Sequence, residues 1–435
     1  MGEHTFDASA IPEGLRELPG GPELLDLARG RTDVALVGGA VRDLMLDRAP
    51  RELDVVVGGD HPTFAPAFRF ARELAARLGP CAKIDEHERF GTALVTCDGA
   101  RVDIAGARRE RYEAPGALPL VAPATLERDL LRRDFTVNAI AVTLEGKRPG
   151  EAHAPPGALE DLRAGRLRVL HDASFLDDPT RLLRLARYAA RLGFEIEPET
   201  SALVTRALNA RALETVSGAR IGAELRLAAG EPDAVGSFAR MDRMGLLSAL
   251  HPRLRFDRAA IERALALLPS DGRRDLLILA ALTLPLALRA DDPQAELTAL
   301  LDRLEFTAPD RERVVASAGA VRQLANVLAA AAAAAAGDGG AARPSRLRAA
   351  LAAVPVEGIA LAGGVSARCA EPAGRWLGEL REVTLSITGE DLLAAGIPEG
   401  PEIGRRLDAA LDRKLDREIS GGREAELAAA LEARA

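Results

Sequence analysis

The stretch "LVGGAVRDLMLDRAPRELDVVV", residues 36–57, combines two adjacent glycines, an Arg-Asp pair and two carboxylates with apolar runs on either side. Its pattern of apolar and polar residues predicts a strand, a glycine turn, a short helix and a second strand, at residues 34–37, 38–39, 41–46 and 53–57. Glu52 and Asp54 lie two residues apart at the start of the second strand. Side chains alternate across a strand, so both carboxylates are expected on the same face.

Two carboxylates on one face of a strand repel each other unless water, a cation or basic groups offset their charge. Magnesium is a natural candidate, because it prefers oxygen ligands and is often held by one or two carboxylates together with substrate phosphates. Gly38 and Gly39 lack a Cβ, so backbone N–H groups near them are expected to reach a triphosphate at the N-terminus of the following helix. The alternative interpretation is a tight turn beside a solvated acidic strand end, since glycine pairs are common in turns.

The composition is that of a soluble globular protein. The chain has 435 residues, of which 48% are hydrophobic and 28% charged, enough for roughly two to four domains. The N-terminus lacks a basic-then-apolar signal pattern, and no apolar run is long enough to span a bilayer without charges or breaks. The three cysteines, Cys81, Cys97 and Cys369, are far apart in sequence and have no metal-ligand spacing. That usage suits a reducing compartment, so we expect a cytoplasmic protein with no membrane partner.

The pattern of apolar and polar residues changes along the chain. Up to about residue 144, apolar runs such as "TALVT" and "RVDIA" alternate with helical stretches such as "APAFRFARELAARLG", which predicts a compact mixed α/β domain. From Asp178 onward Leu/Ala/Arg periodicity replaces the strand pattern, so the remainder is expected to be helical. The alanine run 329–336 and the following "GDGGAARPS" predict a frayed helix end and a linker before a C-terminal helical unit.

A second polar motif, "RRDFTVNA" at residues 132–139, continues the helical pattern that begins at "TLERDLL". Asp134 and Asn138 are four residues apart, which would place them on one face of that helix with Arg133 at its edge. Taken by itself, this pattern is also compatible with an ordinary solvated helix face.

A third motif, "DDPTRLLRLARYAARLGF" at residues 177–194, predicts a well-delimited helix. Asp178 is expected as its N-cap, Pro179 as its first residue and Gly193 just past its end. Arginines recur along this helix at three- and four-residue steps and predict one basic ridge, formed by Arg181, Arg184, Arg187 and Arg191.

Taken in order, "GGAVRD", "ELD", "RRDFTVNA", "DDPTR" and "VSGARIGAEL" resemble the motifs of the class II tRNA nucleotidyltransferases, the family of CCA-adding enzymes and bacterial poly(A) polymerases. The intervening "RFGTALV" and "VDIAGARRERYEAPGALPLV" strengthen the resemblance. The wording of "PGALP" and "SFLDDPTR" is most similar to the branch that contains separate A-adding and CC-adding enzymes. The motifs cover residues 34–230, and "ITGEDLLAAGIPEGPEIG" adds weaker support in the C-terminal half.

The resemblance implies an α+β fold, in which a nucleotidyltransferase head with a mixed sheet and helices is followed by an all-α neck, body and tail. The corresponding bounds are head 1–145, neck 146–230, body 231–328, Ala/Gly-rich linker 329–345 and tail 346–435. The helical parts would hold the acceptor end of a tRNA. The implied activity is template-independent addition of C, A or both to the tRNA 3′ end from CTP and ATP, with Mg²⁺ as cofactor and release of pyrophosphate.

The resemblance also implies a role for each motif residue. Glu52 and Asp54 would bind two Mg²⁺ ions, with Asp103 of "RVDIA" as a third catalytic carboxylate. The nucleotide-binding positions form three sets: Gly38, Gly39, Arg42 and Asp43 on the triphosphate side, Arg133, Asp134 and Asn138 at the ribose, and Asp178 and Arg181 at the base. The expected RNA-binding residues are Arg184, Arg187, Arg191 and Arg220. The first metal ligand of the family is often Asp, and here it is Glu52, whose extra methylene alters the geometry of that ligand.

The pair Asp178 and Arg181 also suits a base-reading role on chemical grounds. Cytosine and adenine present an exocyclic amino donor beside a ring-nitrogen acceptor, whereas uracil and guanine present a carbonyl beside an N–H donor. A carboxylate next to a guanidinium therefore complements C and A, and mismatches U and G at a cost of about 1–3 kcal/mol. The same pair suits both C and A, so it does not distinguish full CCA addition from CC-only or A-only addition. The Gly- and Pro-containing loop at residues 109–121 favours terminal A addition, since it would allow the base site to reorient.

Features of the sequence also bear on several rival functions. The net charge of −8 argues against a protein that coats nucleic acid nonspecifically, and no G-x-x-x-x-G-K-[ST] P-loop occurs. His171–Asp172 is an HD dipeptide of the kind that phosphohydrolases use, but the six histidines are scattered and no second HD pair exists. A poly(A) polymerase and a catalytically inactive RNA-binding module on the same fold stay open as alternatives.

Overall fold

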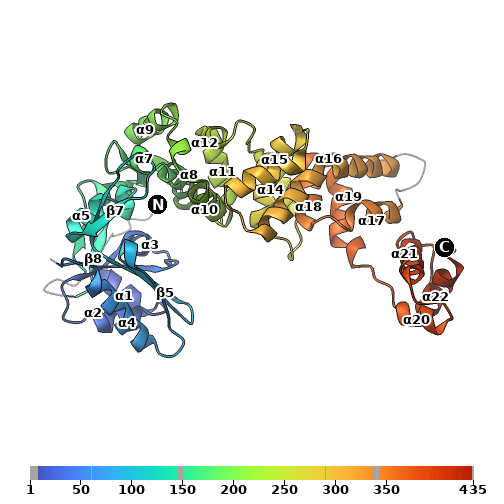
Figure 1. Cartoon of the computed structure of the whole chain (residues 1–435), viewed down its shortest axis with the longest axis horizontal. Coiled ribbons are helices and arrows are strands. Elements are labelled where there is room, and N and C mark those ends of the chain that lie inside the picture. Colours follow the sequence, from blue (N-terminus) through green and yellow to red (C-terminus); the bar gives the residue numbers. More distant parts are fainter. Residues whose placement is uncertain (1–7, 60, 146–149, 290, 337–342, 434–435) are drawn as a thin grey trace. The chain divides into compact units, whose positions relative to one another are not determined.

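A mixed sheet organises the N-terminal unit of the computed structural model (Figure 1). Its strands lie in the order β3–β4–β5–β2–β1–β8–β9, in which β2 and β5 are parallel and the other adjacent pairs are antiparallel. The strands are Val34–Val37 (β1), Leu53–Val57 (β2), Lys83–His87 (β3), Thr92–Cys97 (β4), Ala100–Gly106 (β5), Ala141–Thr143 (β8) and Ala152–His153 (β9). The strands predicted at residues 34–37 and 53–57 are therefore confirmed as β1 and β2.

The structure describes residues 8–59, 61–145, 150–289, 291–336 and 343–433. They fall into two compact units, Met1–Ser217 and Gly218–Ala435. The sheet lies in the first unit, and the described part of the second unit is helical. The predicted α+β fold, with a mixed sheet and helices followed by an all-α remainder, is confirmed.

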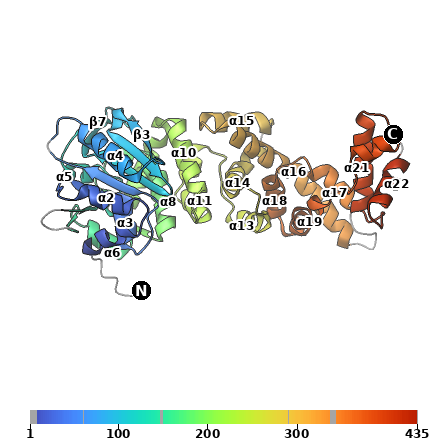
Figure 2. The ribbon, with the colours of Figure 1, turned by 90° about the horizontal axis from the view of Figure 1, so that it is seen from below.

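The two faces of the sheet have different partners. Helix α4 (Ala65–Leu78) packs against β2, β3, β4 and β5, and Figure 2 shows it alongside these strands. On the other face Val56 belongs to an apolar cluster with Leu130. Because side chains alternate along a strand, Asp54 lies on the same face as Val56. The acidic residue is thereby held at the edge of an apolar cluster.

Helix α3 begins earlier than the sequence predicted. It spans Gly38–Met45, so the two glycines form its first turn rather than a separate turn before it. Gly38 has a φ of 68°, a left-handed conformation that glycine adopts at little cost. Its N–H donates to the carbonyl oxygen of Ile140 at 2.9 Å. This bond fixes the start of α3 against the chain just before β8.

The segment 132–139 is not helical, contrary to the prediction. Helix α5 (Leu126–Leu131) ends before it, and a short 3-10 turn, η3 (Thr136–Asn138), follows. Between them Phe135 is extended and pairs with Val169 in an isolated β-bridge. The Phe135 side chain is fully buried, so packing in the core overrides the helical pattern of the sequence.

Helix α8 (Thr180–Leu192) is the helix predicted from residues 177–194. It begins after Pro179, not at it, and ends at Gly193, whose φ is 72°. Asp178 still caps the first turn, because its Oδ1 accepts from the N–H of Thr180 at 3.1 Å and from the Thr180 hydroxyl at 2.6 Å. The predicted stop at Gly193 is therefore confirmed, whereas the N-cap position is occupied by Pro179 rather than by Asp178.

The remaining elements of the first unit surround these. They are η1 (Ala8–Ala10), α1 (Ile11–Arg16), α2 (Gly21–Ala28), η2 (Glu88–Phe90), β6 (Arg108–Arg111), β7 (Leu120–Pro123), α6 (Ala158–Ala164), β10 (Arg166–Leu167), α7 (Ser174–Asp177), β11 (Glu195–Ile196), α9 (Pro198–Asn209) and η4 (Ala212–Thr215). Strands β6 and β7 form an antiparallel pair, and β10 and β11 form a short parallel one.

The second unit is built from helices. They are α10 (Gly218–Ala229), α11 (Ala234–Arg243), α12 (Leu246–Leu250), α13 (Arg258–Leu267), α14 (Arg274–Arg289), α15 (Pro293–Arg303), α16 (Ala308–Ala336), α17 (Pro344–Leu351), α18 (Val356–Val365), α19 (Ala367–Gly378), η5 (Leu380–Glu382), α20 (Gly389–Ala394), α21 (Pro401–Leu415) and α22 (Arg423–Glu432). In the part of the chain that the structure describes, α16 is the one helix long and apolar enough to cross a membrane. It packs against α14, α15, α18 and α19.

The predicted linker at 329–345 differs from the structure. Its alanines, 329–336, are the last turns of α16, because alanine has the highest helix propensity of all residues. Residues 337–342 lie outside the described residues. Beyond them, α17, α18 and α19 pack against α16, so the linker does not separate these helices from the body. The five-part division of the chain otherwise stays a prediction.

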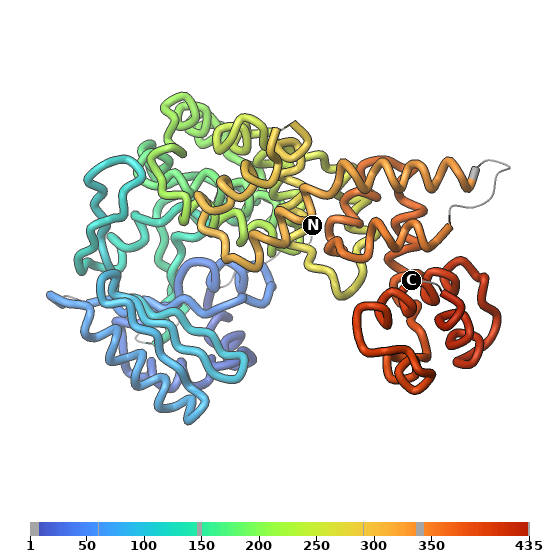
Figure 3. The backbone as a smooth tube through the Cα atoms, turned by 45° about the vertical axis from the view of Figure 1, so that its right-hand side comes forward, coloured from blue at the N-terminus to red at the C-terminus, as the bar shows by residue number. Residues whose placement is uncertain are grey.

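The last three helices form a group with its own core (Figure 3). An apolar cluster joins α20, α21 and α22 through Leu392, Ala410 and Ala429. Helix α17 is tied to α21 by the Ser345 hydroxyl, which donates to Asp416 at 2.7 Å, and by Arg348, which donates to Asp412 at 2.8 Å.

The cysteines correct one sequence-based expectation. Cys81 and Cys97 are paired in a disulfide, with their Cα atoms 5.2 Å apart, whereas the cysteine usage was interpreted as that of a reducing compartment. Cys369 is free and buried. The pairing was not visible in the sequence because the turn after α4 and the end of β4 approach each other only in the folded sheet.

Candidate active site

Three carboxylates converge where β2 and β5 run side by side. Asp54 on β2 is the direct parallel partner of Asp103 on β5, so the two side chains share one face of the sheet. Glu52 precedes β2 on the same face, and its charge acts on both aspartates. The sequence predicted the first two as a pair, and the strand pairing brings in the third.

The negative charges of this acidic cluster repel one another, and the pKa values of Asp54 and Asp103 are raised. The pKa of Asp54 is raised to about 7, chiefly by burial and also by the charges of Glu52 and Asp103, while Arg133 and Arg42 oppose that rise. Burial also raises the pKa of Asp103, again reinforced by Glu52. Glu52 itself accepts from Arg101 at 2.7 Å on the exposed side of the cluster. The cluster therefore carries more negative charge than its protein neighbours offset.

This donor set fits a divalent cation. Carboxylate oxygens are the ligands that Mg²⁺ prefers, and one or two of them together with phosphate oxygens form its usual protein sites. A cation would relieve the repulsion that raises the pKa values of Asp54 and Asp103. Glu52, Asp54 and Asp103 are the residues that would hold it.

The glycines bring the start of α3 close to the acidic cluster. A Cβ at Gly38 would lie 2.7 Å from Nη1 of Arg133 and 3.6 Å from Oδ2 of Asp54. A Cβ at Gly39 would lie 3.5 Å from the same Asp54 oxygen. Gly38 is therefore required both for its backbone conformation and for the space that Arg133 occupies. Its own N–H is used by Ile140, so anion binding at this helix start falls to the N–H groups that follow.

Arg42 and Asp43 are buried, and their predicted role on the triphosphate side stays a prediction. Arg42 donates to Oδ1 of Asp43 through Nε at 2.8 Å and Nη2 at 2.7 Å, and its Nη1 donates to the side-chain oxygen Oδ1 of Asn138. Arg191 donates to the second Asp43 oxygen at 2.8 Å. Only 1% of Arg42 is exposed, so its guanidinium supports the site through buried hydrogen bonds.

Asp134 and Asn138 do come together, although not through a helix. The Asn138 amide donates to Oδ1 of Asp134 at 3.0 Å, and the same oxygen accepts from the N–H of Phe135 at 2.9 Å. Arg184 donates to Oδ2 through Nε at 2.9 Å and Nη2 at 2.7 Å. Burial alone would raise the pKa of Asp134, but the Arg184 charge and these hydrogen bonds hold it at about 2.

Arg133 lies between this network and the acidic cluster. It donates to Oδ2 of Asp129 through Nε at 3.3 Å and Nη2 at 2.9 Å, and Arg132 donates to the other Asp129 oxygen at 2.8 Å. Asp129 is fully buried, so it anchors both arginines. Arg133 is thereby directed toward Gly38 and Asp54.

The proposed base-reading pair is positioned at the start of α8. Arg181 donates through Nη1 to the Ser174 hydroxyl at 2.8 Å and through Nη2 to the carbonyl oxygen of Arg132 at 2.7 Å. A guanidinium has five N–H groups, so these two bonds fix its plane and use only part of its donor capacity. Asp178 uses Oδ1 to cap Thr180.

The predicted RNA-facing ridge of α8 is directed inward. Arg184 pairs with Asp134, Arg191 pairs with Asp43, and Arg187 is 5% exposed with its guanidinium 4.9 Å from the Tyr188 ring centroid. Two of these arginines are thus engaged in ion pairs within the unit and the third packs on a ring, and their contact with RNA stays a prediction. Arg220 lies on α10 in the other unit and is half-exposed.

The rival HD dipeptide gains no support from its surroundings. Burial and the charge of Arg181 lower the pKa of His171. Its carbonyl oxygen accepts from the N–H of Ser174, which places it at the start of α7. A neutral histidine beside a cation at a helix start is a packing feature.

Sequence reasoning missed several residues that hold the site in place. Asp129 was detectable, because "ERDLLRRD" places an acid three and four residues before two arginines. Ser174 and Tyr188 gave no comparable signal, because the Arg181–Ser174 bond and the contacts of Tyr188 with Arg42 and Phe135 form only in the folded structure.

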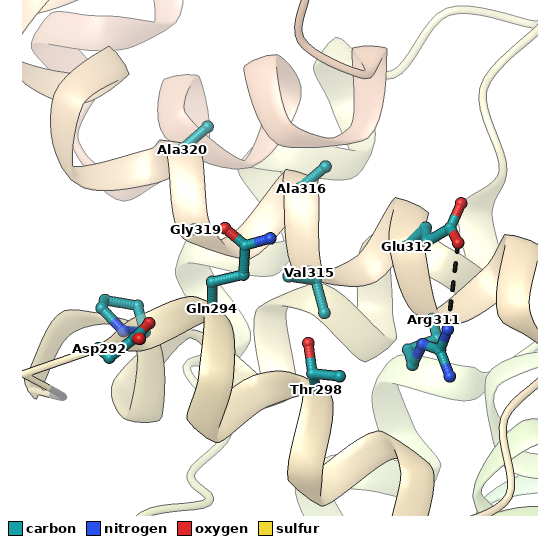
Figure 4. A pocket seen from close by; sticks show the side chains of 10 residues that line it. Asp292, Gln294, Thr298, Arg311, Glu312, Val315, Ala316, Gly319 and Ala320 are labelled. Carbon is teal, nitrogen blue, oxygen red and sulfur yellow. Dashed lines mark ion pairs between the residues drawn. The ribbon is translucent and has the colours of Figure 1, made fainter.

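The second unit has a hollow of about 770 Å³ between α15 and α16 (Figure 4). Small side chains such as Ala316 and Ala320 line it together with Gln294 and Thr298. Its charged residues are Asp292, Arg311 and Glu312, of which Arg311 and Glu312 pair at 4.0 Å. The acidic chemistry of the first unit is not repeated in this lining.

Family models match two parts of the chain. The poly A polymerase head domain matches residues 34–168, which include the acidic cluster and the segment 132–139. A second model, described as the probable RNA and SrmB- binding site of polymerase A, matches residues 193–257.

Similar proteins fall into one group. The chain is 33% identical over 404 residues to an A-adding tRNA nucleotidyltransferase of Geobacter sulfurreducens, covering 89% of this chain and 44% of that protein. A CC-adding tRNA nucleotidyltransferase of Deinococcus radiodurans is 42% identical, over 46% of this chain and 51% of that protein. The chain thus spans about half or less of the length of these relatives. A multifunctional CCA protein of Xanthomonas campestris is 31% identical, over 87% of this chain and 96% of that protein.

Solved structures agree with this grouping. A CCA-adding enzyme in an apo form superposes with a TM-score of 0.77 at 29% identity, covering 94% of this chain and 96% of that one. The Thermotoga maritima CCA-adding enzyme complexed with tRNA gives a TM-score of 0.75 at 26% identity, covering 98% and 99%. The sequence motifs, the acidic sheet and the full-length similarity lead to one conclusion. This chain belongs to the class II tRNA nucleotidyltransferase family.

Proposed function

We propose that this protein adds nucleotides to the 3′ end of tRNA, using CTP, ATP or both and releasing pyrophosphate. The observation that carries the proposal is the convergence of Glu52, Asp54 and Asp103 beside the glycine start of α3. Proteins similar to this chain are named A-adding, CC-adding and multifunctional CCA enzymes. Similar structures have been solved with tRNA, with CTP and with ATP.

The acidic cluster is the proposed cation site. Glu52 and Asp54, with Asp103 beside them, would hold divalent cations, and Mg²⁺ is our specific proposal. Bound there, the cations supply polarisation of the tRNA 3′-hydroxyl and neutralisation of the departing pyrophosphate. The chain itself aligns the two reactants, so no protein nucleophile is needed.

The residues around the cluster would hold the nucleotide. The backbone N–H groups that follow Gly38 in the first turn of α3 would bind the triphosphate at the start of that helix. Arg133, fixed by Asp129, provides a cation between Asp54 and the ribose side. Asn138 is the proposed ribose contact, and Asp134 orients it, because all four acceptor positions of Asp134 are engaged by protein donors. Arg42 and Asp43 support this arrangement from within.

The base would be read by Asp178 and Arg181. A carboxylate and a guanidinium complement the acceptor-donor edge shared by C and A. Ser174 and the Arg132 carbonyl fix the guanidinium plane, which favours a rigid reading of that edge. Discrimination against U and G then follows from mismatched donors and acceptors.

We propose terminal A addition as the product activity. The Geobacter relative, which matches 89% of this chain, is named as an A-adding enzyme. C addition is the second candidate, favoured by the Deinococcus relative. A poly(A) polymerase of the family remains the alternative for a broader RNA substrate. We place the activity in the cytoplasm, where tRNA maturation supplies the substrate.

A three-substrate assay tests the proposal. Purified protein is incubated with tRNA transcripts that end before CCA, after C and after CC, each with one nucleoside triphosphate and Mg²⁺. Extension of the CC-ending tRNA by ATP supports A addition, and extension of the shortest tRNA by CTP supports C addition. Long A tracts on unrelated RNA would instead identify a poly(A) polymerase. Extension by none of the combinations would identify an inactive RNA-binding module.

A further inference from the structure

Tyr188 on α8 lies at the meeting point of three guanidinium groups. The guanidinium carbons of Arg187, Arg42 and Arg184 lie 4.9, 5.3 and 5.4 Å from its ring centroid. The ring also meets Phe135 edge-on, with centroids 5.9 Å apart and an interplanar angle of 80°. One half-buried tyrosine thus connects α3, the segment before η3 and its own helix.

Three cations around one ring repel each other, so specific groups must stabilise the arrangement. Asp43 pairs with Arg42, and Asp134 pairs with Arg184, which neutralises two of the charges. An aromatic face carries the negative part of the ring quadrupole and attracts cations within about 6 Å of the centroid. Tyr188 therefore fixes where the guanidiniums lie, while the carboxylates balance their charge.

Two of these arginines are the same groups that hold the ribose side of the nucleotide site. Arg42 donates to the side-chain oxygen Oδ1 of Asn138, and Arg184 donates to Asp134, which in turn accepts from the side-chain Nδ2 of Asn138. Asn138 is therefore held from both ends by contacts that meet at the Tyr188 ring. A shift of either guanidinium would rotate or displace the Asn138 amide.

We propose that Tyr188 is a positioning residue for ribose recognition, acting through Arg42 and Arg184 on Asn138. This inference rests on the proposed nucleotidyl-transfer function. Tyr188 does not itself touch the nucleotide in this account. The ring, rather than the hydroxyl, carries the effect, because the bond that Arg184 donates to the hydroxyl is long at 3.3 Å.

The test compares Tyr188→Leu with Tyr188→Phe. Both are assayed for kcat/KM with ATP and with 2′-deoxyATP, and the ratio of the two values measures ribose recognition. Loss of the ring contacts is expected to lower that ratio about tenfold in Tyr188→Leu, with the KM for ATP rising more than kcat falls. Tyr188→Phe keeps the ring and is expected to restore the ratio.

Leu192→Ala is the matched control, since Leu192 is buried on the same helix and takes part in none of the hydrogen bonds and ring contacts described above. It should lower thermal stability without changing the ratio. The proposal is overturned if Tyr188→Leu keeps the wild-type ratio, or if Tyr188→Phe loses as much selectivity as Tyr188→Leu. If Tyr188→Leu does not fold, Tyr188→Met replaces it, because Met fills a similar volume without a ring.

A second measurement separates this proposal from the proposed function. If the wild-type protein adds no nucleotide, the function fails, and the positioning role is judged by melting temperatures of Tyr188→Leu, Asn138→Ala and the double variant. Smaller-than-additive shifts show that Tyr188 and Asn138 are coupled. Additive shifts overturn the positioning role.

Discussion

Asp134 accepts two hydrogen bonds from Arg184 on one carboxylate oxygen, at 2.9 and 2.7 Å, across 50 residues of sequence. The pair joins the non-helical segment 132–139 to α8, so the proposed ribose and base contacts share one support. Through Asn138 and Arg42 the same network reaches α3. The elements that carry the motifs are thereby held together by buried, charge-assisted hydrogen bonds.

Breaking the Asp134–Arg184 pair should lower the free energy of unfolding by an amount that depends on pH. Asp134→Asn removes the charge that Arg184 needs, and we expect a loss of about 2–3 kcal/mol at pH 7. The pKa of Asp134 is about 2, against 3.8 for the unperturbed group, so its folded pKa is depressed. Its contribution is then fully present above pH 3.8 and is lost as the pH falls toward 2.

Denaturant unfolding of wild type and Asp134→Asn at pH 7, 4 and 2.5 checks this. The difference in the free energy of unfolding between wild type and Asp134→Asn should be constant between pH 7 and about 5 and should become smaller at pH 2.5. A gap that is equally large at pH 2.5 would mean that the carboxylate charge is not what stabilises the contact.

Asp54→Ala should abolish nucleotide addition while largely preserving tRNA affinity. The proposed cation site and the helical RNA-binding parts use different residues, and loss of a cation ligand is expected to lower the rate by about 1,000-fold or more. The protein should be at least as stable as wild type, because folding buries the Asp54 carboxylate among other acids. Single-turnover assays, tRNA filter binding and thermal melting measure the three effects. Mg²⁺-dependent addition near the wild-type rate would remove Asp54 from the site.

Gly38→Ala and Gly39→Ala form a matched pair at the start of α3. Gly38 has a φ of 68°, and its new Cβ would lie 2.7 Å from Arg133, so we expect a loss of about 1–3 kcal/mol and strongly reduced activity. At Gly39 the nearest contact is 3.5 Å, which is ordinary van der Waals distance, so the substitution should be milder. Equal effects of the two substitutions on melting temperature and activity would contradict this account of the turn.

Arg181→Ala should weaken the use of CTP and ATP and relax the rejection of UTP and GTP. The Arg181 donors match the C and A edges only, and a lost base contact changes discrimination by about 1–3 kcal/mol. Ser174→Ala is the companion variant, because it removes one bond that orients Arg181 without removing the guanidinium, and it should give a smaller change of the same sign. Unchanged incorporation ratios for all four nucleotides in Arg181→Ala would place base reading elsewhere.

Local patterns predicted the strands and helix ends well. The apolar alternation before Gly38 and after Glu52 identified β1 and β2, and Gly193 marked the end of α8 because glycine readily adopts the left-handed conformation there. The pairing of Asp54 with Asp103 was only suggested by motif order, since the β2–β5 register depends on the whole sheet.

The errors have a common physical cause. Segment 132–139 reads as a helix, but burial of Phe135 imposes an extended backbone. The arginines of α8 were predicted as one basic ridge, and two of them, Arg191 and Arg184, pair with Asp43 and Asp134, which are distant in sequence. Tertiary partners that no local pattern encodes decided both cases.

The most direct test of the central claim is the extension of a tRNA ending in CC by ATP, with the product sized at single-nucleotide resolution. We predict that the wild-type protein adds one A in the presence of Mg²⁺, and that the Asp54→Ala protein adds none although it still binds the tRNA. The account is contradicted if the wild-type protein neither extends this tRNA with ATP nor extends a tRNA lacking all of CCA with CTP.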